Sequence, residues 1–397
     1  MKLRRVFMCM AVALLAMMVV FGCSGGDGEK TPTATEPIKI GAIFSVTGGA
    51  ARLGGPEKNA ALMIQEQVNN AGGIKGRTIE LIIEDDAGIV ENTVNAIQKL
   101  IHRDNVVAVI GPTRSGNGMA VAPIAQESRI PLVSCAAAVT QQYPEGDMTK
   151  PVYPYVFKTP QNDSHCAITI FKDCQAKGFK KVAIITGTTG FGAAGRAELQ
   201  RYAGKYDIDL VADETYPPDA SDLTPILTKI KAEKPQAVIN WSIVEAQALI
   251  AGQMKQIGLD VQLYQSHGFG NKAYITEAAE GILFPAGRLL VLNDIDPSDV
   301  QYDVLTKFKN DYETKYGEEV STFAGHAYDA LWMVLKAIET TDADRDLIRG
   351  GLEATNNFIG TAGVFNMAPD DHCGLTEDAF VMVTVKDGEF RLASAVQ

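Results

Sequence analysis

The clearest place for chemistry in this sequence is a turn between a predicted strand and a predicted helix. Residues 106–110 form an apolar, β-branched run, and Gly-Pro-Thr-Arg-Ser-Gly follows it from Gly111 to Gly116. Free amide hydrogens in such a turn, together with the positive end of a helix dipole, make a site for a carboxylate. Ser115 places a hydroxyl donor there, and Arg114 stands beside it. The turn therefore predicts an anion-binding site.

A second open stretch of backbone follows the next predicted strand. Residues 131–134 predict this strand, and Ala136, Ala137 and Ala138 come just after it. Their small side chains leave the amide and carbonyl groups accessible to a ligand lying close by. Both segments follow strands, and ligands of parallel sheets sit beyond the carboxyl ends of the strands.

A glycine-rich segment matches the dinucleotide-binding fingerprint G-x-G-x-x-G. It runs from Gly190 to Gly195, after a predicted strand and before a predicted helix, and Asp213 and Glu214 follow about 20 residues on, where a ribose-binding acid is expected. The motif alone is weak evidence. The export signal described below places the chain away from cytosolic nucleotides, so a ligand loop without nucleotide is the favoured interpretation.

The remaining polar residues form no catalytic or metal-binding pattern. The five histidines match neither H-x-x-x-H nor H-E-x-x-H, and no G-x-S-x-G elbow or P-loop is present. Asp85 and Asp86 are neighbours at a strand end, so their side chains point to opposite faces. We expect one to cap the following turn and the other to shape the rim of a cleft. The sequence predicts no enzyme, no metal and no cofactor.

These motifs are set in a chain that alternates short β-branched runs with amphipathic helical stretches. The first series has expected strands at 38–44, 78–84, 106–110 and 131–134 and helices at 57–70, 91–102 and 119–128. The second has helices at 164–177, 193–205, 222–233 and 244–257 and strands at 181–186, 210–214, 237–240 and 262–265. Such alternation predicts βαβ units and an α/β fold with two doubly wound parallel-sheet lobes.

The joints between the lobes are also predicted. About 360 residues beyond the N-terminal segment exceed one hydrophobic core. The chain is expected to cross between lobes at 153–160, near 286–290 and at 360–363, with long helices at 300–316 and 323–339 returning to lobe one and a hairpin of 379–386 and 389–395 on lobe two. Lobe one then comprises 38–158 plus 288–361, and lobe two 159–287 plus 362–397. The cleft between them is where a small molecule would be buried.

The N-terminal segment predicts export and lipid attachment. Lys2, Arg4 and Arg5 precede an apolar run that is too short to span a bilayer comfortably, and the run ends at Val20-Phe21-Gly22-Cys23. This resembles a bacterial lipobox, with residues 1–22 as a lipoprotein signal peptide and Cys23 as the lipidated residue, although Phe21 is atypical. An ordinary signal peptide is the alternative. Residues 23–37 are rich in Ser, Gly, Thr and Pro, which is the composition of a tether.

The net charge of the exported chain excludes some classes of partner. Removing residues 1–22 removes three positive charges and leaves 33 Lys plus Arg against 48 Asp plus Glu, a net charge of −15. This argues against nucleic acid or an anionic membrane surface as partner, which leaves the lipid as the only membrane contact.

Cys166 and Cys174 lie eight residues apart on one predicted helix, too far for a disulfide. Whether Cys135 and Cys373 pair is left open.

Several motifs, in order, resemble the branched-chain amino-acid class of periplasmic solute-binding proteins of ABC importers, which includes the leucine/isoleucine/valine-binding protein. The likeness covers residues 38–395 and is carried by Ser45-x-Thr47-Gly48, Ile64-x4-Asn69-x2-Gly72-Gly73-Ile74-x-Gly76, Asp85-Asp86, Val109-Ile110-Gly111-Pro112-x2-Ser115, Ile130-Pro131-x2-Ser134 and Ser321-Thr322-Phe323-x-Gly325-His326-Ala327-Tyr328-Asp329-Ala330. It implies a type I periplasmic-binding-protein fold and a lipid-anchored protein on the periplasmic or extracellular face of a bacterial membrane. It also implies delivery of a small molecule to an ABC permease. A sensor feeding a receptor and, more remotely, an amidase-like enzyme are the alternatives.

The resemblance also implies ligand-binding positions. Members that bind amino acids use a Ser hydroxyl, which falls on Ser115, and backbone groups that fall on Ala136 and Ala137. The positions of a Thr, two Tyr residues and the acid that pairs with the ligand ammonium fall on Ala138, Phe191, Ile243 and His267.

These departures, with Trp241 and Arg114 nearby, indicate a more apolar site without its acid. A buried ammonium without a carboxylate partner is costly. The resemblance implies a branched-chain amino acid or a related small organic acid, and these departures favour a small carboxylic acid without an α-amino group, aromatic or aliphatic. Glu245 or Asp163 remains a source of the missing charge.

Overall fold

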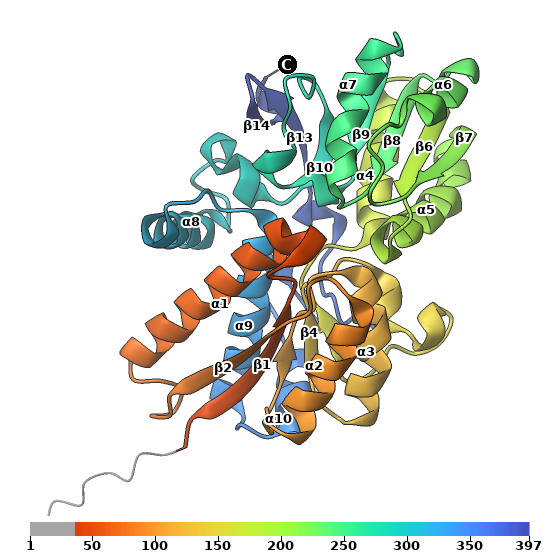
Figure 1. Ribbon diagram of the computed structural model, residues 1–397. Helices are drawn as coiled ribbons and strands as arrows, with labels where there is room; N and C mark the ends of the chain where they lie inside the picture. Colours follow the sequence, from red (N-terminus) through yellow and green to blue (C-terminus); the bar gives the residue numbers. More distant parts are fainter. Residues whose placement is uncertain (1–35, 397) are drawn as a thin grey trace, which may run out of the picture. The chain divides into compact units, whose positions relative to one another are not determined.

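Two sheets organise residues 36–396, the part of the chain that the computed structural model describes (Figure 1). The first sheet is parallel, with the strand order β2-β1-β3-β4-β5. Its strands are β1 (Ile38–Phe44), β2 (Ile79–Asp85), β3 (Val109–Ile110), β4 (Leu132–Ser134) and β5 (Val156–Lys158). The helices between them are α1 (Ala51–Asn70), α2 (Val90–His102) and α3 (Ser115–Glu127). We call this sheet and its helices lobe one.

The second sheet has the strand order β14-β13-β10-β9-β8-β6-β7. Its parallel strands are β6 (Lys181–Gly187), β7 (Asp209–Tyr216), β8 (Ala237–Trp241), β9 (Gln262–Gln265) and β10 (Leu283–Ala286), and the hairpin β13 (Val381–Lys386) and β14 (Glu389–Leu392) adds antiparallel strands. The helices are α4 (Asp163–Ala176), α5 (Gly190–Ala203), α6 (Thr224–Ala232) and α7 (Leu249–Gln256). We call this sheet and its helices lobe two.

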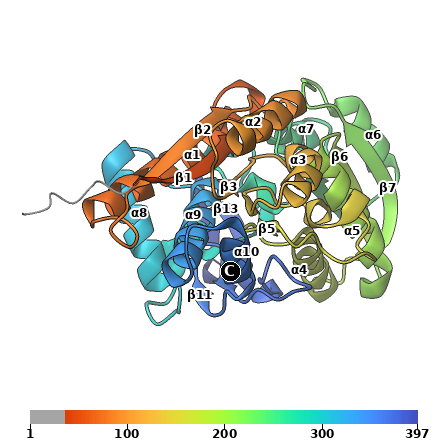
Figure 2. The same ribbon diagram turned by 90° about the horizontal axis from the view of Figure 1, so that it is seen from below.

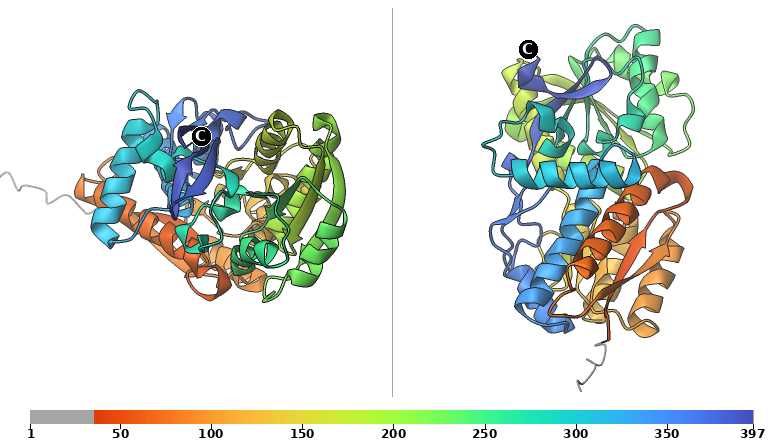
Figure 3. Two further views of the ribbon diagram at one scale, coloured as in Figure 1. Left: turned by 90° about the horizontal axis from the view of Figure 1, so that it is seen from above. Right: turned by 90° about the vertical axis from the view of Figure 1, so that its left-hand side faces the viewer.

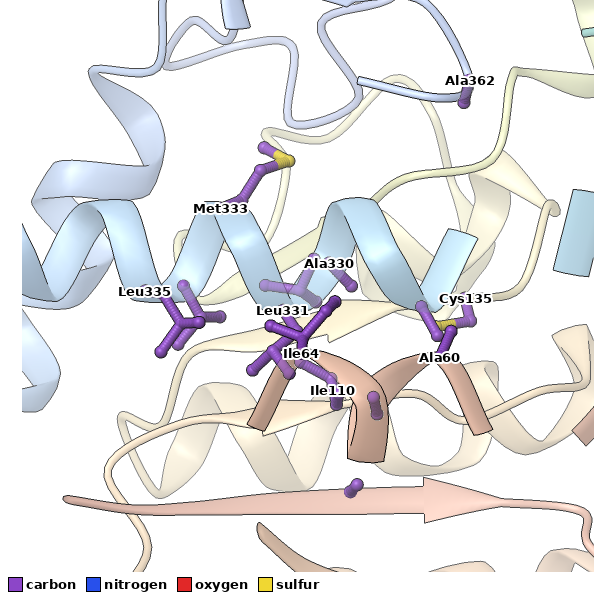
Figure 4. Packing of buried hydrophobic residues seen from close by; sticks show 14 of the residues in the cluster. Ala60, Ile64, Ile110, Cys135, Ala330, Leu331, Met333, Leu335 and Ala362 are labelled. Carbon is purple, nitrogen blue, oxygen red and sulfur yellow. The ribbon is translucent and has the colours of Figure 1, made fainter. Parts of the chain in front are cut away.

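Three further helices return the chain to lobe one. They are α8 (Tyr302–Tyr316), α9 (Thr322–Thr340) and α10 (Arg345–Glu353), followed by the short pair β11 (Phe358–Ile359) and β12 (Val364–Phe365). Figure 4 shows Ala330 and Leu331 of α9 beside Ala60 and Ile64 of α1, within one buried hydrophobic cluster. Figures 2 and 3 show α9 and α1 side by side from other directions. The chain therefore passes between the two sheets three times, as predicted.

Buried hydrogen bonds tie the first and third crossing segments to each other and to α9. Gln161 Nε2 donates to the carbonyl of Ala362 at 2.8 Å, which joins the first crossing to the third. The Asp329 carboxylate accepts from the amides of Thr361 (2.7 Å) and Ala362 (2.8 Å) and so anchors the third crossing on α9. Thr159 Oγ1 donates to the carbonyl of His326 at 2.9 Å. These bonds fix the ends of the segments about which the lobes would turn.

The predicted fold class is confirmed, but three helices begin earlier than predicted. The structure starts α1, α3 and α5 at Ala51, Ser115 and Gly190, where the sequence predicted starts at 57, 119 and 193. Glycines near the start of each helix, joined by Pro56 in α1, lowered the helical expectation. The predicted helix 244–257 begins instead as a 3₁₀ turn, Glu245–Ala248, before α7. Strands β10 to β12 and helix α10 were not predicted.

Several predictions about the chain remain untested. The signal peptide 1–22, Cys23 and nearly all of the tether lie outside the described residues. The residue boundaries of the two lobes stay a prediction. Among residues 36–396, no helix is long and apolar enough to cross a membrane. The four cysteines described are buried and unpaired.

Candidate ligand-binding site

A small cavity of about 20 Å³ lies where the two lobes meet. Lobe one contributes Thr113, Ser115, Cys135 and Ala137, and the first crossing segment contributes Pro160. Lobe two contributes Phe191, Ile243, His267 and Gly268, and helix α9 adds Phe323 and His326. This space holds about one water molecule. A larger ligand therefore requires the lobes to open for entry and the cavity walls to rearrange around it on closing.

Ser115 begins α3 and is buried, with its hydroxyl directed at the neighbouring loop. Its Oγ accepts a hydrogen bond from the amide of Ala138 at 3.2 Å. A serine hydroxyl has one hydrogen to donate, and this bond does not use it. The hydrogen of Ser115 thus remains available to an acceptor in the cavity, at the positive end of a helix.

The three alanines predicted as backbone contacts have different roles. The amide of Ala136 donates to Ser134 Oγ at 3.1 Å, and its carbonyl accepts from Gln141 Nε2 at 2.8 Å. The amide of Ala138 is bonded to Ser115, as described above. Ala137 alone lines the cavity, and its amide appears in none of the hydrogen bonds described. Ala137 N–H and Ser115 O–H are therefore the donors that lobe one presents.

Arg114 points away from this cavity. Its Nη1 donates to the carbonyl of Gly88 at 3.2 Å, and it is not among the cavity-lining residues. The side chain therefore braces the loop before α2 in this structure.

A buried hydrogen-bond network supports the lobe-one wall. The Asp86 carboxylate accepts from Ser45 Oγ (2.6 Å), Thr93 Oγ1 (2.9 Å) and Asn117 Nδ2 (2.9 Å). Asn117 lies in the first turn of α3, so the network positions the helix that carries Ser115. Asp85, by contrast, is exposed and accepts from the amides of Val46 and Ala87, both at 2.9 Å. The expectation that Asp85 and Asp86 differ in role agrees with these contacts, although Asp86 is fully buried.

The glycines of the dinucleotide-like motif are explained by packing. A Cβ on Gly190 would lie 2.7 Å from the amide nitrogen of Gly116, across the boundary between the lobes. A Cβ on Gly195 would lie 2.1 Å from the indole ring of Trp241. The motif thus permits close approach of protein to protein, and Phe191 between these glycines lines the cavity.

The lobe-two wall is largely aromatic. The ring of His267 makes edge contacts with Phe191 and Trp241, with centroids 5.2 and 5.6 Å apart. Trp241 is completely buried behind the wall, and its Nε1 has no hydrogen-bond partner. Ile243 completes the apolar surface. Phe191, Ile243 and His267 therefore meet at one cavity, and Trp241 supports them from behind.

His267 faces a buried acid on its far side. Its Nε2 lies 3.8 Å from Oδ1 of Asp163, and neither ring nitrogen of His267 has a hydrogen-bond partner. Burial lowers the pKa of His267 well below its usual value, and the nearby charge of Lys158 adds to this shift. Burial raises the pKa of Asp163 to about 7, against the lowering effect of Lys158. Glu245, the other acid considered, instead forms an exposed ion pair with Arg52 of lobe one at 3.0 Å.

The contributions of α9 and of the first crossing segment to the cavity were not predicted from the sequence. Phe323 and His326 are buried in the cavity wall although they lie some 200 residues after Ser115 in the chain. Burial lowers the pKa of His326 to about 3, so this imidazole is neutral. Only the return of α9 to lobe one brings these residues to the site, and local pattern does not encode that. The one available signal was their place within the Ser321–Ala330 motif.

Two larger clefts are lined by residues from both lobes, with volumes of 710 and 1180 Å³. Neither includes Ser115 or the alanine stretch. Within residues 36–396, no group of three or more His, Cys, Asp or Glu is arranged to hold a metal ion. The small cavity is therefore where the predicted ligand groups converge.

The sequence is similar to known proteins along most of its length. The family model described as periplasmic binding protein matches residues 37–389. The leucine-, isoleucine-, valine-, threonine- and alanine-binding protein of Pseudomonas aeruginosa is 25% identical over 367 residues, which cover 91% of this chain and 90% of that protein.

Two solved structures show the same arrangement of elements. An extracellular ligand-binding receptor from Rhodopseudomonas palustris HaA2 superposes with a TM-score of 0.82 at 26% identity, covering 90% of this chain and 99% of that one. The substrate-binding protein LivJ of the branched-chain amino acid transporter of Streptococcus pneumoniae, in complex with isoleucine, has a TM-score of 0.75 at 25% identity over 90% and 99% of the two chains. The fold is that of type I periplasmic binding proteins. With its two sheets, three crossings and inter-lobe cavity, the chain belongs to the periplasmic binding protein family.

Proposed function

We propose that this protein is the extracytoplasmic solute-binding subunit of an ABC importer, anchored by lipid on Cys23. It binds a branched-chain amino acid or a related small carboxylic acid between its lobes and performs no chemistry on it. The ligand shifts the population of lobe arrangements toward the closed form, which the permease then engages.

One observation carries this proposal. Ser115, whose hydroxyl hydrogen is unused, and Ala137, whose amide is unpartnered, line the same cavity at the amino end of α3, and lobe two covers them. Two such donors beside a helix terminus suit a carboxylate. The name of the Pseudomonas aeruginosa relative and the isoleucine bound to LivJ support ligands of this size and kind.

Thermal-shift screening of the purified protein against amino acids and small carboxylic acids tests the binding function. A ligand that binds only the folded state at 100 times its Kd stabilises it by about 2.7 kcal/mol. We expect at least one such compound to raise Tm, and no compound to be consumed during incubation. Consumption of a compound would indicate an enzyme.

Uptake and anchoring need separate measurements. Vesicles that contain the cognate permease and ATPase should accumulate the radiolabelled ligand only when this protein is added. Binding without any effect on uptake would favour a sensor. Mass spectrometry of the N-terminal peptide should show a lipid on Cys23 that is absent from a Cys23→Ser variant.

A further inference from the structure

Given the proposed function, the charges around the cavity bear on whether the ligand carries an ammonium group. No residue that lines the cavity is an aspartate or glutamate. Asp163, the acid beside His267, is not among the lining residues, because the imidazole ring stands on the cavity side. An ammonium in this cavity would therefore lack the direct carboxylate contact that a buried cation needs.

A buried lysine already supplies positive charge next to the cavity. Lys158 is completely buried at the end of β5, and its Nζ donates to the carbonyl of Pro160 at 2.5 Å and to Asn162 Oδ1 at 2.8 Å. Pro160 itself lines the cavity, and the charge of Lys158 lowers the pKa values of both His267 and His326. The cavity thus lies in a positive field, which disfavours an ammonium and favours an anion.

His267 can complete the binding of an anion by taking up a proton. Its Nε2 is 3.8 Å from the Asp163 carboxylate, and its Nδ1 has no partner. A ligand carboxylate held by Ser115 and Ala137 enters the same small cavity. The imidazole would then lie between two carboxylates, and opposite charges nearby favour its protonated form.

We propose that the ligand is a small monocarboxylic acid with an apolar body and no ammonium group, and that its binding is coupled to protonation of the His267–Asp163 pair. The proton comes from solvent and resides on the imidazole, between the ligand carboxylate and Asp163. Phe191, Ile243 and Phe323 provide the apolar surface for the body of the acid.

The charged and titratable groups around the His267–Asp163 pair come from four elements. They are Asp163 and Cys166 on α4, Lys158 on β5, Glu198 on α5 and His326 on α9. The other ring contacts of His267, Phe191, Trp241 and Phe380, carry no charge. His326 is neutral at neutral pH, so we assign the coupled proton to the His267–Asp163 pair.

The sign of the pH dependence follows from these groups. The free pair takes up its proton as the pH falls through about 7, the pKa of Asp163. Above that pH, binding must bring the proton with it, so affinity weakens by up to about tenfold per pH unit as the pH rises. Below pH 7 the free pair already holds the proton, and affinity is expected to level off.

Isothermal titration of the full purified chain tests both parts. Leucine and 4-methylpentanoate form a matched pair that differs only in the ammonium group, and benzoate tests an aromatic body. We expect 4-methylpentanoate or benzoate to bind at least about tenfold more tightly than leucine. At pH 8, titrations in buffers of different ionisation enthalpy should show uptake of about one proton per ligand bound.

Variants assign the proton to the pair. His267→Gln keeps a polar side chain that does not titrate, and it should abolish proton uptake and flatten the pH profile. His102→Gln changes an exposed histidine at the end of α2 and should leave both unchanged. If His267→Gln fails to fold, Asp163→Asn provides the same test, because it removes the acid of the pair.

The outcomes separate this inference from the proposed function. Tighter binding of leucine than of 4-methylpentanoate and benzoate, or binding without proton uptake at pH 8, would overturn the inference and leave the binding function intact. If no amino acid or carboxylate binds at all, the proposed function falls and the inference falls with it.

Discussion

The buried polar groups of the two cleft walls are satisfied to different degrees. In lobe one, Asp86 accepts three buried side-chain hydrogen bonds and Ser115 and Asn117 both have partners, while Glu57 Oε1 and His326 Nδ1 have none. In lobe two, side-chain atoms of His267 and Trp241, and likewise of Gln247 and Gln265, are buried without partners. Both walls are equally buried. The difference is therefore one of hydrogen bonding.

This difference suggests a division of labour between the lobes. A wall whose groups are already fixed by neighbours binds its target without further ordering, which suits a group that every ligand shares, such as a carboxylate. Buried polar atoms without partners are costly, and the cost is relieved only by ligands that supply the matching groups. Lobe one would thus hold the ligand, and lobe two would select it. Four changes test this comparison.

The largest expected effect comes from removing Asp86, the centre of the lobe-one network. Asp86→Ala removes the acceptor that three buried side chains and the amide of Gly88 share, and each buried donor left unsatisfied costs about 1–3 kcal/mol. We expect urea unfolding to show stability lower by about 4 kcal/mol. Asp219→Ala, which changes an exposed loop residue, should have no measurable effect. Equal stability of the two variants would show that the lobe-one wall is not held by this network.

The next effect concerns the shared group of the ligand. Ser115→Ala removes a hydroxyl donor to a carboxylate, and a hydrogen bond to a charged group contributes about 1.5–3 kcal/mol, or roughly 10- to 100-fold in Kd. The loss should be similar for every carboxylate that binds, because the donor belongs to the holding wall. Calorimetry on two different ligands checks this, with Ser128→Ala at the far end of α3 as control. A loss confined to one ligand would contradict the division of labour.

The prediction of the fold from sequence succeeded where local pattern is decisive. Strands β1 and β9 match their predicted bounds, and the alternation of strand and helix identified two parallel-sheet lobes. Helix starts at Ser115 and Gly190 were missed because glycines lower helix propensity. In the folded protein these glycines permit close contact between the lobes, and no local pattern reports contacts made across a cleft.

The site residues were also predicted unevenly, because local sequence pattern does not report tertiary contacts. Ser115, Ala137, Phe191, Ile243 and His267 were chosen from sequence, and the structure brings them to one cavity. Asp163 was considered only as a distant source of charge, and Lys158 was not considered. Both act from behind the wall, where a residue's effect depends on burial and on tertiary distance.

A moderate effect is expected where the lobes touch. A Cβ on Gly190 would lie 2.7 Å from Gly116 N and 2.8 Å from its Cα, both backbone atoms that cannot move aside independently. Gly190→Ala should hold the lobes apart and weaken binding by about tenfold, because closing then costs free energy. Gly204→Ala, at the other end of α5, meets nothing within 4 Å and serves as control. Small-angle scattering with saturating ligand should show a larger radius of gyration for Gly190→Ala only; identical radii would mean that this contact does not limit closure.

The smallest effect is expected at the rim of the cleft, where the walls are joined by charge. Arg52 on α1 pairs with Glu245 before α7 at 3.0 Å, and both side chains are more than half exposed. Exposed pairs contribute at most about 1 kcal/mol, so Arg52→Ala should weaken binding by about threefold at low salt. Because the pair is screened by ions, the difference from the unmodified protein should vanish near 1 M salt. Titrations at two salt concentrations check this. Lys58→Ala is the control, because Lys58 is a cation of the same helix and no ion pair is described for it. A loss that persisted at high salt would show that the rim contributes packing as well as charge, and that selection is not confined to the inner wall of lobe two.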